Sequence, residues 1–289
     1  MIPGPGFTLI QSVLHPTDFS EGSLVAFNHA LKAAMLSKCK LTLLHVSTDG
    51  TSEWSHFPGV RETLERWGEL PKGSPKAAVG KLGIDACKVM LNKGEPVDLV
   101  VNYLEDNPND LIVLSTSKRD GRIPWLGKSV AEPVTRKAGE MTLLIPGDVE
   151  GFVSHEDGSV NLKQILIPIA RTPRPEPALT AAARLVEKWK CSEGTFVILH
   201  VGNSNTMPAV RLPEVPGWTW KKELQTGDVI EGIVKSAQEH KADLILLATD
   251  GRNGFLDALR GSHSERILRH GVAPLLTIPV GSRVSRFLS

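Results

Sequence analysis

Residues 110–147 read DLIVLSTSKRDGRIPWLGKSVAEPVTRKAGEMTLLIPG, and residues 243–281 read DLILLATDGRNGFLDALRGSHSERILRHGVAPLLTIPVG. Asp110 aligns with Asp243, and the match continues to the end of both stretches. A repeat of this length is far longer than one unit of a solenoid, so it indicates a duplicated domain.

The duplication extends upstream of these stretches. VLHPTDFS at residues 13–20 matches ILIPIART at residues 165–172, and KLTLLHVS at residues 40–47 matches TFVILHVG at residues 195–202. The join between the copies, DVEGFVSHEDGSVNL, is polar and contains glycine and serine, as linkers do. We therefore expect a first domain at residues 1–147, a linker at residues 148–162 and a second domain at residues 163–289.

Each copy alternates short apolar runs with helical patterns. In the first copy, SVLHP, LTLLHV, CKVMLN, LIVLS and TLLI are the expected strands. Between the first two, Ser20 is a candidate helix N-cap, and apolar side chains recur at helical spacing; these are Leu24, Phe27, Leu31 and Met35. Strands without polar alternation, separated by helices, predict an α/β fold with a mostly parallel sheet covered on both faces.

The second copy follows the same plan with differences. Its prolines predict that the first helix begins near Pro175, because proline is tolerated only in a first helical turn. The Pro-rich connection at residues 202–217 predicts a loop in place of a helix. Trp218 and Trp220 flank a threonine in a strand pattern, and we expect them to cover an exposed sheet face or an interface.

Composition excludes several classes of protein. The 289 residues carry 33 Lys plus Arg and 32 Asp plus Glu, and neither half has the basic excess of a nucleic-acid binder. No apolar run is long enough for a membrane span, and no signal peptide is evident. Three scattered cysteines argue against a disulfide framework, and we expect a cytoplasmic protein.

A doubly wound sheet binds ligands at the carboxyl ends of its strands, where the strand order reverses. In the second copy, the fourth strand is followed by Gly251, Gly254, Gly261 and Ser262. Glycines allow the backbone close to a ligand, and a helix N-terminus favours an anion such as phosphate. The alternative is that Ser262 and Glu265 form a capping box, which would occupy the same backbone groups internally.

These residues carry a resemblance to the universal stress protein family, with two family domains in tandem. The resemblance rests on HPTDFSEGS, LTLLHV and DLIVLST in the first copy, and on GDVIEGIV, ADLILLATDGRNG and GSHSERILRHGVAPLLTIP in the second. It implies two doubly wound five-stranded sheets, each of order 3-2-1-4-5. It further implies a pseudo-two-fold through the fifth strands, with residues 142–146 paired to residues 275–279, since an uncovered apolar edge strand invites association.

Nucleotide-binding members of this family have a glycine, two residues, a glycine, nine residues, then a glycine and Ser or Thr. The second copy matches this pattern with Ala248, Gly251, Gly261 and Ser262, so only the first glycine is replaced. The first copy departs further, because Lys118 replaces the middle glycine and the spacing to its last glycine is altered. The first copy also resembles a Walker A loop near this point, but it has one residue too many between the glycines.

The two copies differ in the opposite sense at the aspartate that follows the family's first strand, because here it is the first copy that keeps the family residue. The first copy has Asp18, whereas the second has Ala170, which leaves the backbone of Ile169 and Val201 to recognise adenine. By resemblance, the nucleotide residues of the second domain are Pro168, Ile169, Ala170, Val201, Ala248, Gly251, Gly261, Ser262, His263 and Ser264. A weaker site in the first domain would use Thr17, Asp18, Val46, Gly127, Lys128 and Ser129.

The leading functional hypothesis is a stress-response regulatory protein that binds ATP or ADP, with or without Mg²⁺, in its second domain. One alternative is a scaffold without nucleotide, in which both degenerate sites serve protein partners; another is a slow ATP hydrolase, with Asp250 orienting water. No catalytic residues are assigned, because no nucleophile elbow appears. His45 and His200 lack nearby ligands at metal spacing. The partners expected are an adenine nucleotide, an unidentified protein and a second copy of the chain.

Overall fold

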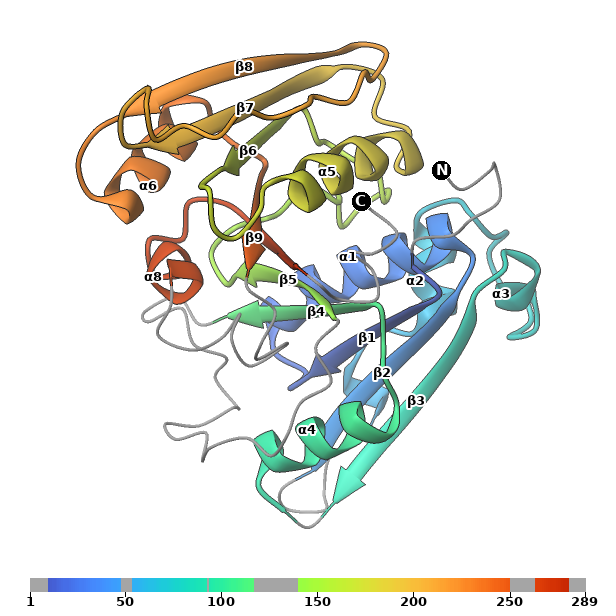
Figure 1. The fold of residues 1–289 in the computed structure, drawn as a ribbon. Helices are drawn as coiled ribbons and strands as arrows, with labels where there is room; N and C mark the ends of the chain where they lie inside the picture. The colour runs from blue at the N-terminus through green and yellow to red at the C-terminus, as the bar shows by residue number, and fades with distance from the viewer. Residues whose placement is uncertain (1–9, 48–53, 93, 117–139, 250–262, 281–289) are drawn as a thin grey trace.

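A computed structural model describes residues 10–47, 54–92, 94–116, 140–249 and 263–280 (Figure 1). The strands form one sheet of order β3-β2-β1-β4-β5-β10-β9-β6-β7-β8. The strands are β1 (Ser12–Thr17), β2 (Lys40–Ser47), β3 (Asp85–Asn92), β4 (Leu111–Thr116), β5 (Met141–Pro146), β6 (Gln164–Pro168), β7 (Gly194–Val201), β8 (Trp218–Gln225), β9 (Leu244–Thr249) and β10 (Leu275–Pro279). The helices are α1 (Glu21–Ser37), η1 (Trp54–His56), α2 (Val60–Arg66), α3 (Ala78–Lys81), α4 (Pro96–Asp106), α5 (Glu176–Lys188), α6 (Val229–Glu239) and α8 (His263–Arg269).

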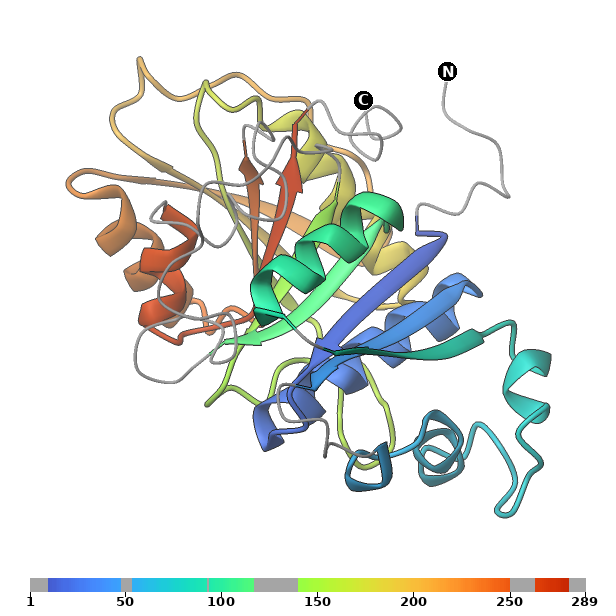
Figure 2. The ribbon, with the colours of Figure 1, turned by 90° about the horizontal axis from the view of Figure 1, so that it is seen from below.

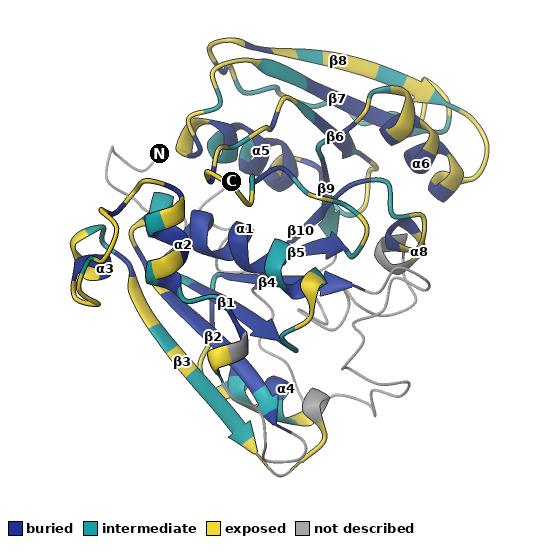
Figure 3. Ribbon diagram, turned by 180° about the vertical axis from the view of Figure 1, so that it is seen from behind, coloured by how far each residue is buried: buried dark blue, intermediate teal, exposed yellow. Residues whose placement is uncertain are grey.

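Each half of the sheet has the predicted strand order 3-2-1-4-5, which confirms that prediction. Every neighbouring pair of strands within each half is parallel. The fifth strands β5 and β10 pair antiparallel, with Thr142 opposite Thr277, as the resemblance implied. Both threonines are buried, and Thr277 Oγ1 donates to the Thr142 carbonyl at 3.4 Å. The junction therefore removes two apolar edges from water and leaves β3 and β8 as the outer edges (Figure 3).

The helices cover both faces of the sheet, which explains the continuous apolar strands. On the first half, α1 and α4 lie on opposite faces (Figure 2), and their side chains belong to different apolar clusters. One cluster continues from α1 through both halves to α5 and includes Phe27 and Phe196; the other joins α4 to α6 and α8. The two halves consequently share a core on each face.

Local expectations for the helices are confirmed. Ser20 is the N-cap of α1 and accepts from the Ser23 N–H at 3.3 Å, while Phe27 and Leu31 on its apolar face are fully buried. Helix α5 begins at the residue after Pro175, and residues 202–217 contain no helix. Among the helices that the structure describes, none combines the length and apolarity that a membrane span requires.

The tryptophans of β8 differ in part from the expectation. Trp218 is buried and Trp220 is half-buried, and both rings lie against Phe196, at centroid distances of 4.5 and 4.1 Å. Both rings lie on the inner face of the edge strand β8 and pack into the core, because the Phe196 ring on β7 offers them a flat apolar surface.

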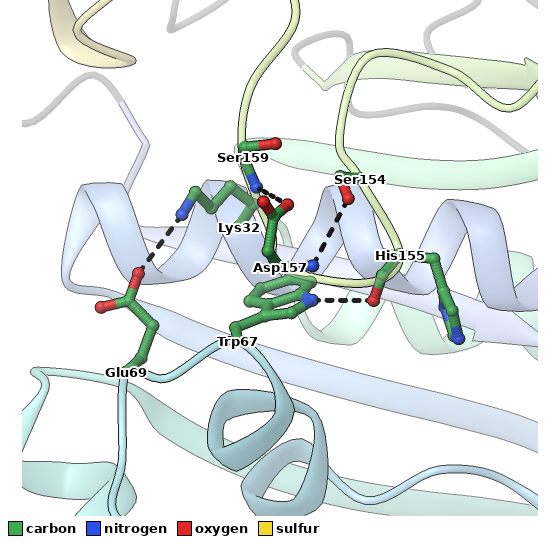
Figure 4. A network of polar contacts seen from close by, with 7 residues as sticks. All are labelled: Lys32, Trp67, Glu69, Ser154, His155, Asp157 and Ser159. Atoms are coloured by element: carbon green, nitrogen blue, oxygen red, sulfur yellow. Dashed lines mark hydrogen bonds and ion pairs between the residues drawn. The ribbon is translucent and has the colours of Figure 1, made fainter.

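The segment at residues 148–162 forms an ordered turn packed on α1 and α2. Val153 and Val160 make an antiparallel bridge, and Phe152 is buried against Trp189 of the second half. Figure 4 shows Trp67 beneath this segment, donating from Nε1 to the His155 carbonyl at 3.1 Å. The polar groups of this join therefore form hydrogen bonds with one another and with neighbouring helices. The domain boundaries at residues 147 and 163 stay a prediction.

Candidate functional site

The predicted residues of the second half meet at the carboxyl ends of β6, β7 and β9. Ala170 is exposed just beyond β6, while Val201 and Ala248 are half-buried near the ends of β7 and β9. Strand β6 lies between β7 and β9, so the chain leaves it at the point where the strand order reverses. This is the position at which an open parallel sheet forms a crevice for a ligand.

The backbone of Ile169 is already engaged within the fold. Its N–H donates to the Leu199 carbonyl at 2.8 Å, and its carbonyl accepts from Nδ1 of His200 at 3.0 Å. The Ile169 N–H is therefore not free to recognise a base, contrary to the expectation from sequence. Ile169, buried, fixes the strand end from which Ala170 projects.

His200 holds the loop that follows β7. Its Nδ1 bonds the Ile169 carbonyl, and its Nε2 lies 2.9 Å from Oγ1 of Thr206. Thr206 in turn accepts from the Asn203 N–H at 3.0 Å. The histidine thus ties the end of β6 to residues 203–206, a structural role in place of metal ligation.

Arg171 is a charged residue beside these strand ends that sequence reasoning missed. It is exposed directly after Ala170, and its guanidinium donates to the Asn205 carbonyl at 2.6 Å. Its side chain therefore connects the β6 end to the β7–β8 loop. The available signal was its position, one residue past a strand end at the order reversal, where a cation can meet an anionic ligand.

The equivalent aspartate of the first half is hydrogen-bonded at the start of α1, beside the N-cap Ser20. Asp18 Oδ1 accepts from Oγ of Ser20 and of Ser23, both at 2.6 Å, and from the Ser20 N–H at 3.0 Å. Burial alone would raise the pKa of this carboxyl, but these hydrogen bonds outweigh it and hold the pKa below its usual range. Asp18 is consequently ionised near neutral pH, with one oxygen already engaged.

Other residues predicted for the first site are also tied into the strand ends. Thr17 is buried, its Oγ1 accepts from the Phe19 N–H at 3.1 Å, and its carbonyl accepts from Nδ1 of His45 at 2.8 Å. Phe19 then stacks on the His45 ring at 3.9 Å. Val46 is half-buried beside them. This corner is therefore an aromatic cluster built on the same histidine-to-carbonyl bond as the second half.

The phosphate side of both sites lies largely outside the described residues. Gly251, Gly261 and Ser262 of the second half, and Gly127, Lys128 and Ser129 of the first, fall there. His263 and Ser264 begin α8, and their side chains are likewise not described. Within the described ranges, no three His, Cys, Asp or Glu side chains are grouped to hold a metal ion.

The universal stress protein family matches the chain at residues 10–146 and again at residues 216–279, which together exceed half its length. The chain belongs to the universal stress protein family. The second match begins near β8 and includes strand β9 and helix α8, and the glycine motif lies between these two elements in the sequence. The two matches agree with the internal duplication.

Solved structures show the same architecture at low identity. A universal stress protein from Archaeoglobus fulgidus DSM 4304 superposes with a TM-score of 0.57 at 17% identity, covering 94% of this chain and 99% of that one. A protein of unknown function from Pseudomonas aeruginosa PAO1 gives 0.55 at 13% identity, covering 96% and 95%. A comparison with curated proteins gave no match. The fold of this universal stress protein therefore occurs over nearly its whole length in other solved structures.

Proposed function

We propose that this universal stress protein is a stress-response regulator that binds ATP or ADP at the carboxyl ends of β6 and β9. The observation that carries the proposal is the sequence Gly251…Gly261-Ser262, which follows directly from the strand where the sheet order reverses. Ala170, Val201 and Ala248 border that position from three strand ends. Glycines near a helix N-terminus suit a phosphate chain.

Arg171 strengthens the electrostatic side of the proposal. The second half lacks the strand-one aspartate of the family, so the proposed site depends more heavily on its phosphate side. An exposed guanidinium one residue later adds positive potential beside the crevice. Arg171 would release Asn205 and contact the nucleotide.

The first half is proposed to bind nucleotide more weakly or not at all. Its Lys118 stands where the family has glycine, and Asp18 Oδ1 already accepts three hydrogen bonds from Ser20 and Ser23. This observation favours a second candidate function, in which the first half serves as a surface for a protein partner. The two functions are compatible, because the ends of β1 and β4 and the ends of β6 and β9 belong to different halves of one sheet.

The test is titration of the purified chain with ATP and ADP by isothermal calorimetry, with and without Mg²⁺. Gly251→Lys should abolish binding, because a side chain would fill the phosphate position. Asn161→Lys adds the same charge near the opposite end of β6 and should leave binding unchanged, since Asn161 is exposed there. Absence of binding at millimolar nucleotide would leave the scaffold function.

Hydrolysis is measured separately. ADP formation with Mg²⁺ over several hours, lost in Gly251→Lys and retained in Asn161→Lys, would establish the weak hydrolase. Bound ATP that remains intact over the same period would support a regulator that responds to occupancy.

A further inference from the structure

The first half contains a cavity of about 860 Å³ between β3 and the helices α2 and α3. Figure 2 shows these helices beside β3, at the outer edge of the first half. Thr17, Asp18 and Val46 of the predicted nucleotide site are not among the residues that line the cavity. Its volume is that of a small-molecule site. The residues that carry the argument are Trp54, Phe57, Lys76, Ile84, Ala86 and Lys88.

The internal duplication shows why space exists here. Lys40 of β2 and Thr195 of β7 are equivalent residues of the two copies. Lys40 pairs with Asp85 and Thr195 pairs with Thr219, so Asp85 and Thr219 are also equivalent. The next residue along each edge strand is Ala86 in the first half and Trp220 in the second, so Ala86 occupies the position of Trp220. By the same register, Ile84 corresponds to Trp218. In the second half, both indoles pack on Phe196 and fill the space beneath the edge strand.

The Trp220 ring is also fixed in place by a hydrogen bond, from Nε1 to the Pro213 carbonyl at 2.8 Å. An exposed Ala86 leaves the corresponding volume open in the first half. Equivalent positions are thus filled by indole rings in the second half and left open in the first.

The wall of the cavity is aromatic. Phe57 is 4% exposed and packs edge-on against Phe27 at 5.1 Å, so its position is set by the core. Trp54 is half-buried and packs edge-on against Phe19 at 5.1 Å. Flat, fixed rings of this kind favour a ligand with a planar apolar body.

The rim of the cavity carries unpaired positive charge. Arg61 is bound by Glu62 at 2.6 Å and by Glu65 at 3.6 Å. Lys76 and Lys88, in contrast, form no ion pair within the part of the chain that the structure describes.

Lys88 is placed to serve a bound anion. Its Nζ lies 4.9 Å from the centre of the Trp54 ring. Loss of hydration is the main cause that lowers the Lys88 pKa; the negative charge of Glu62 opposes it, and the positive charge of Lys76 adds a smaller lowering effect. An anion beside the two lysines would relieve their repulsion while its apolar part covers Trp54.

We propose that this cavity binds an organic acid: a planar, apolar body against Trp54 and Phe57, with one carboxylate held by Lys88 and Lys76. The body would occupy the volume that the Trp220 indole fills in the second half. The site is separate from the proposed nucleotide crevice and does not depend on it.

The experiment uses 2-naphthoate as the probe and 2-naphthamide as its uncharged counterpart, both followed by calorimetry and saturation-transfer NMR on the full chain. The carboxylate should bind about tenfold more tightly than the amide, because only it makes charge-assisted hydrogen bonds. Lys88→Gln should weaken 2-naphthoate by about tenfold and abolish the difference between the probes. Lys222→Gln changes the equivalent exposed lysine of β8 and should have no effect.

Ala86→Trp tests the volume directly, since it installs the side chain of the second half and should abolish binding. Circular dichroism checks its fold; if that variant does not fold, Lys88→Gln and Lys222→Gln carry the decision. Equal binding of both probes, equal weakening by the two lysine variants, or full binding to folded Ala86→Trp would overturn the proposal. Excess ATP should not displace 2-naphthoate, so the result is independent of the nucleotide site.

Discussion

His29 connects the first half to the join between the halves, and its protonation should destabilise the fold. The ring is fully buried, with Nδ1 donating to the Val25 carbonyl at 2.8 Å. Its Nε2 accepts from the N–H groups of Phe152 and Val153, at 3.0 and 3.3 Å. A proton on Nε2 would face two donors without an acceptor, and burial accordingly lowers the pKa of His29 to about 4.

The magnitude follows from the difference in proton binding between the folded and unfolded chains. With an unfolded pKa of about 6.5, the neutral ring contributes about 3 kcal/mol, fully present above pH 6.5 and lost as the pH falls toward 4. Between pH 7 and pH 5 the expected loss from this residue is roughly 2 kcal/mol. His15 has a similarly lowered pKa, because it is also fully buried, and adds its own loss in the same window.

The assay is urea unfolding at pH 7 and pH 5. His29→Gln keeps an acceptor for the join but cannot titrate. The free energy of unfolding that this variant loses between pH 7 and pH 5 should therefore be smaller than the loss in the parent by roughly 2 kcal/mol. Phe152→Ala removes packing beside the same histidine; it should lower stability at both pH values and leave the difference unchanged. An unaltered pH dependence in His29→Gln would refute the assignment of the slope to this ring.

Three further perturbations test the packing. Gly158 has φ +67°, and a Cβ there would lie 2.5 Å from Trp67 Cδ2, so Gly158→Ala should cost about 2 kcal/mol in urea unfolding; an unchanged midpoint would contradict this contact. Thr277→Lys places a charge in the buried β5–β10 junction and should cost several kcal/mol by thermal unfolding, whereas the exposed Thr219→Lys should change little. Ser20→Ala removes the α1 cap and should cost about 1 kcal/mol, and near-parental stability would show that Asp18 replaces it.

Much of the fold was predictable because its signals are local. The apolar runs of β1, β2 and β4, the N-cap Ser20 and the start of α5 after Pro175 depend on residues close in sequence. The pairing of β5 with β10 followed from the family resemblance, with the exposed apolar edge as its physical reason. The glycine motif of the second half could be located but not given a geometry.

The candidate site was less predictable from sequence. Which backbone groups remain free at a strand end depends on neighbours distant along the chain, as His200 shows by occupying the Ile169 carbonyl. The position of the Arg171 side chain became clear only from its contact with Asn205, which connects the β6 end to the loop after β7. Asp18 stays a predicted ligand residue, and only the structure shows that one of its carboxylate oxygens accepts hydrogen bonds from Ser20 and Ser23.

The sequence by itself determined the duplication, the alternation of strands and helices, and the position of the glycine motif, because periodicity and turn residues act over short distances. Only the tertiary structure decided that the polar join packs on His29 and Trp67, and that Ala86 leaves open the space its counterpart Trp220 fills. These outcomes depend on the shapes and hydrogen-bonding groups of segments far apart in the chain. Their complementarity exists only once the chain has folded.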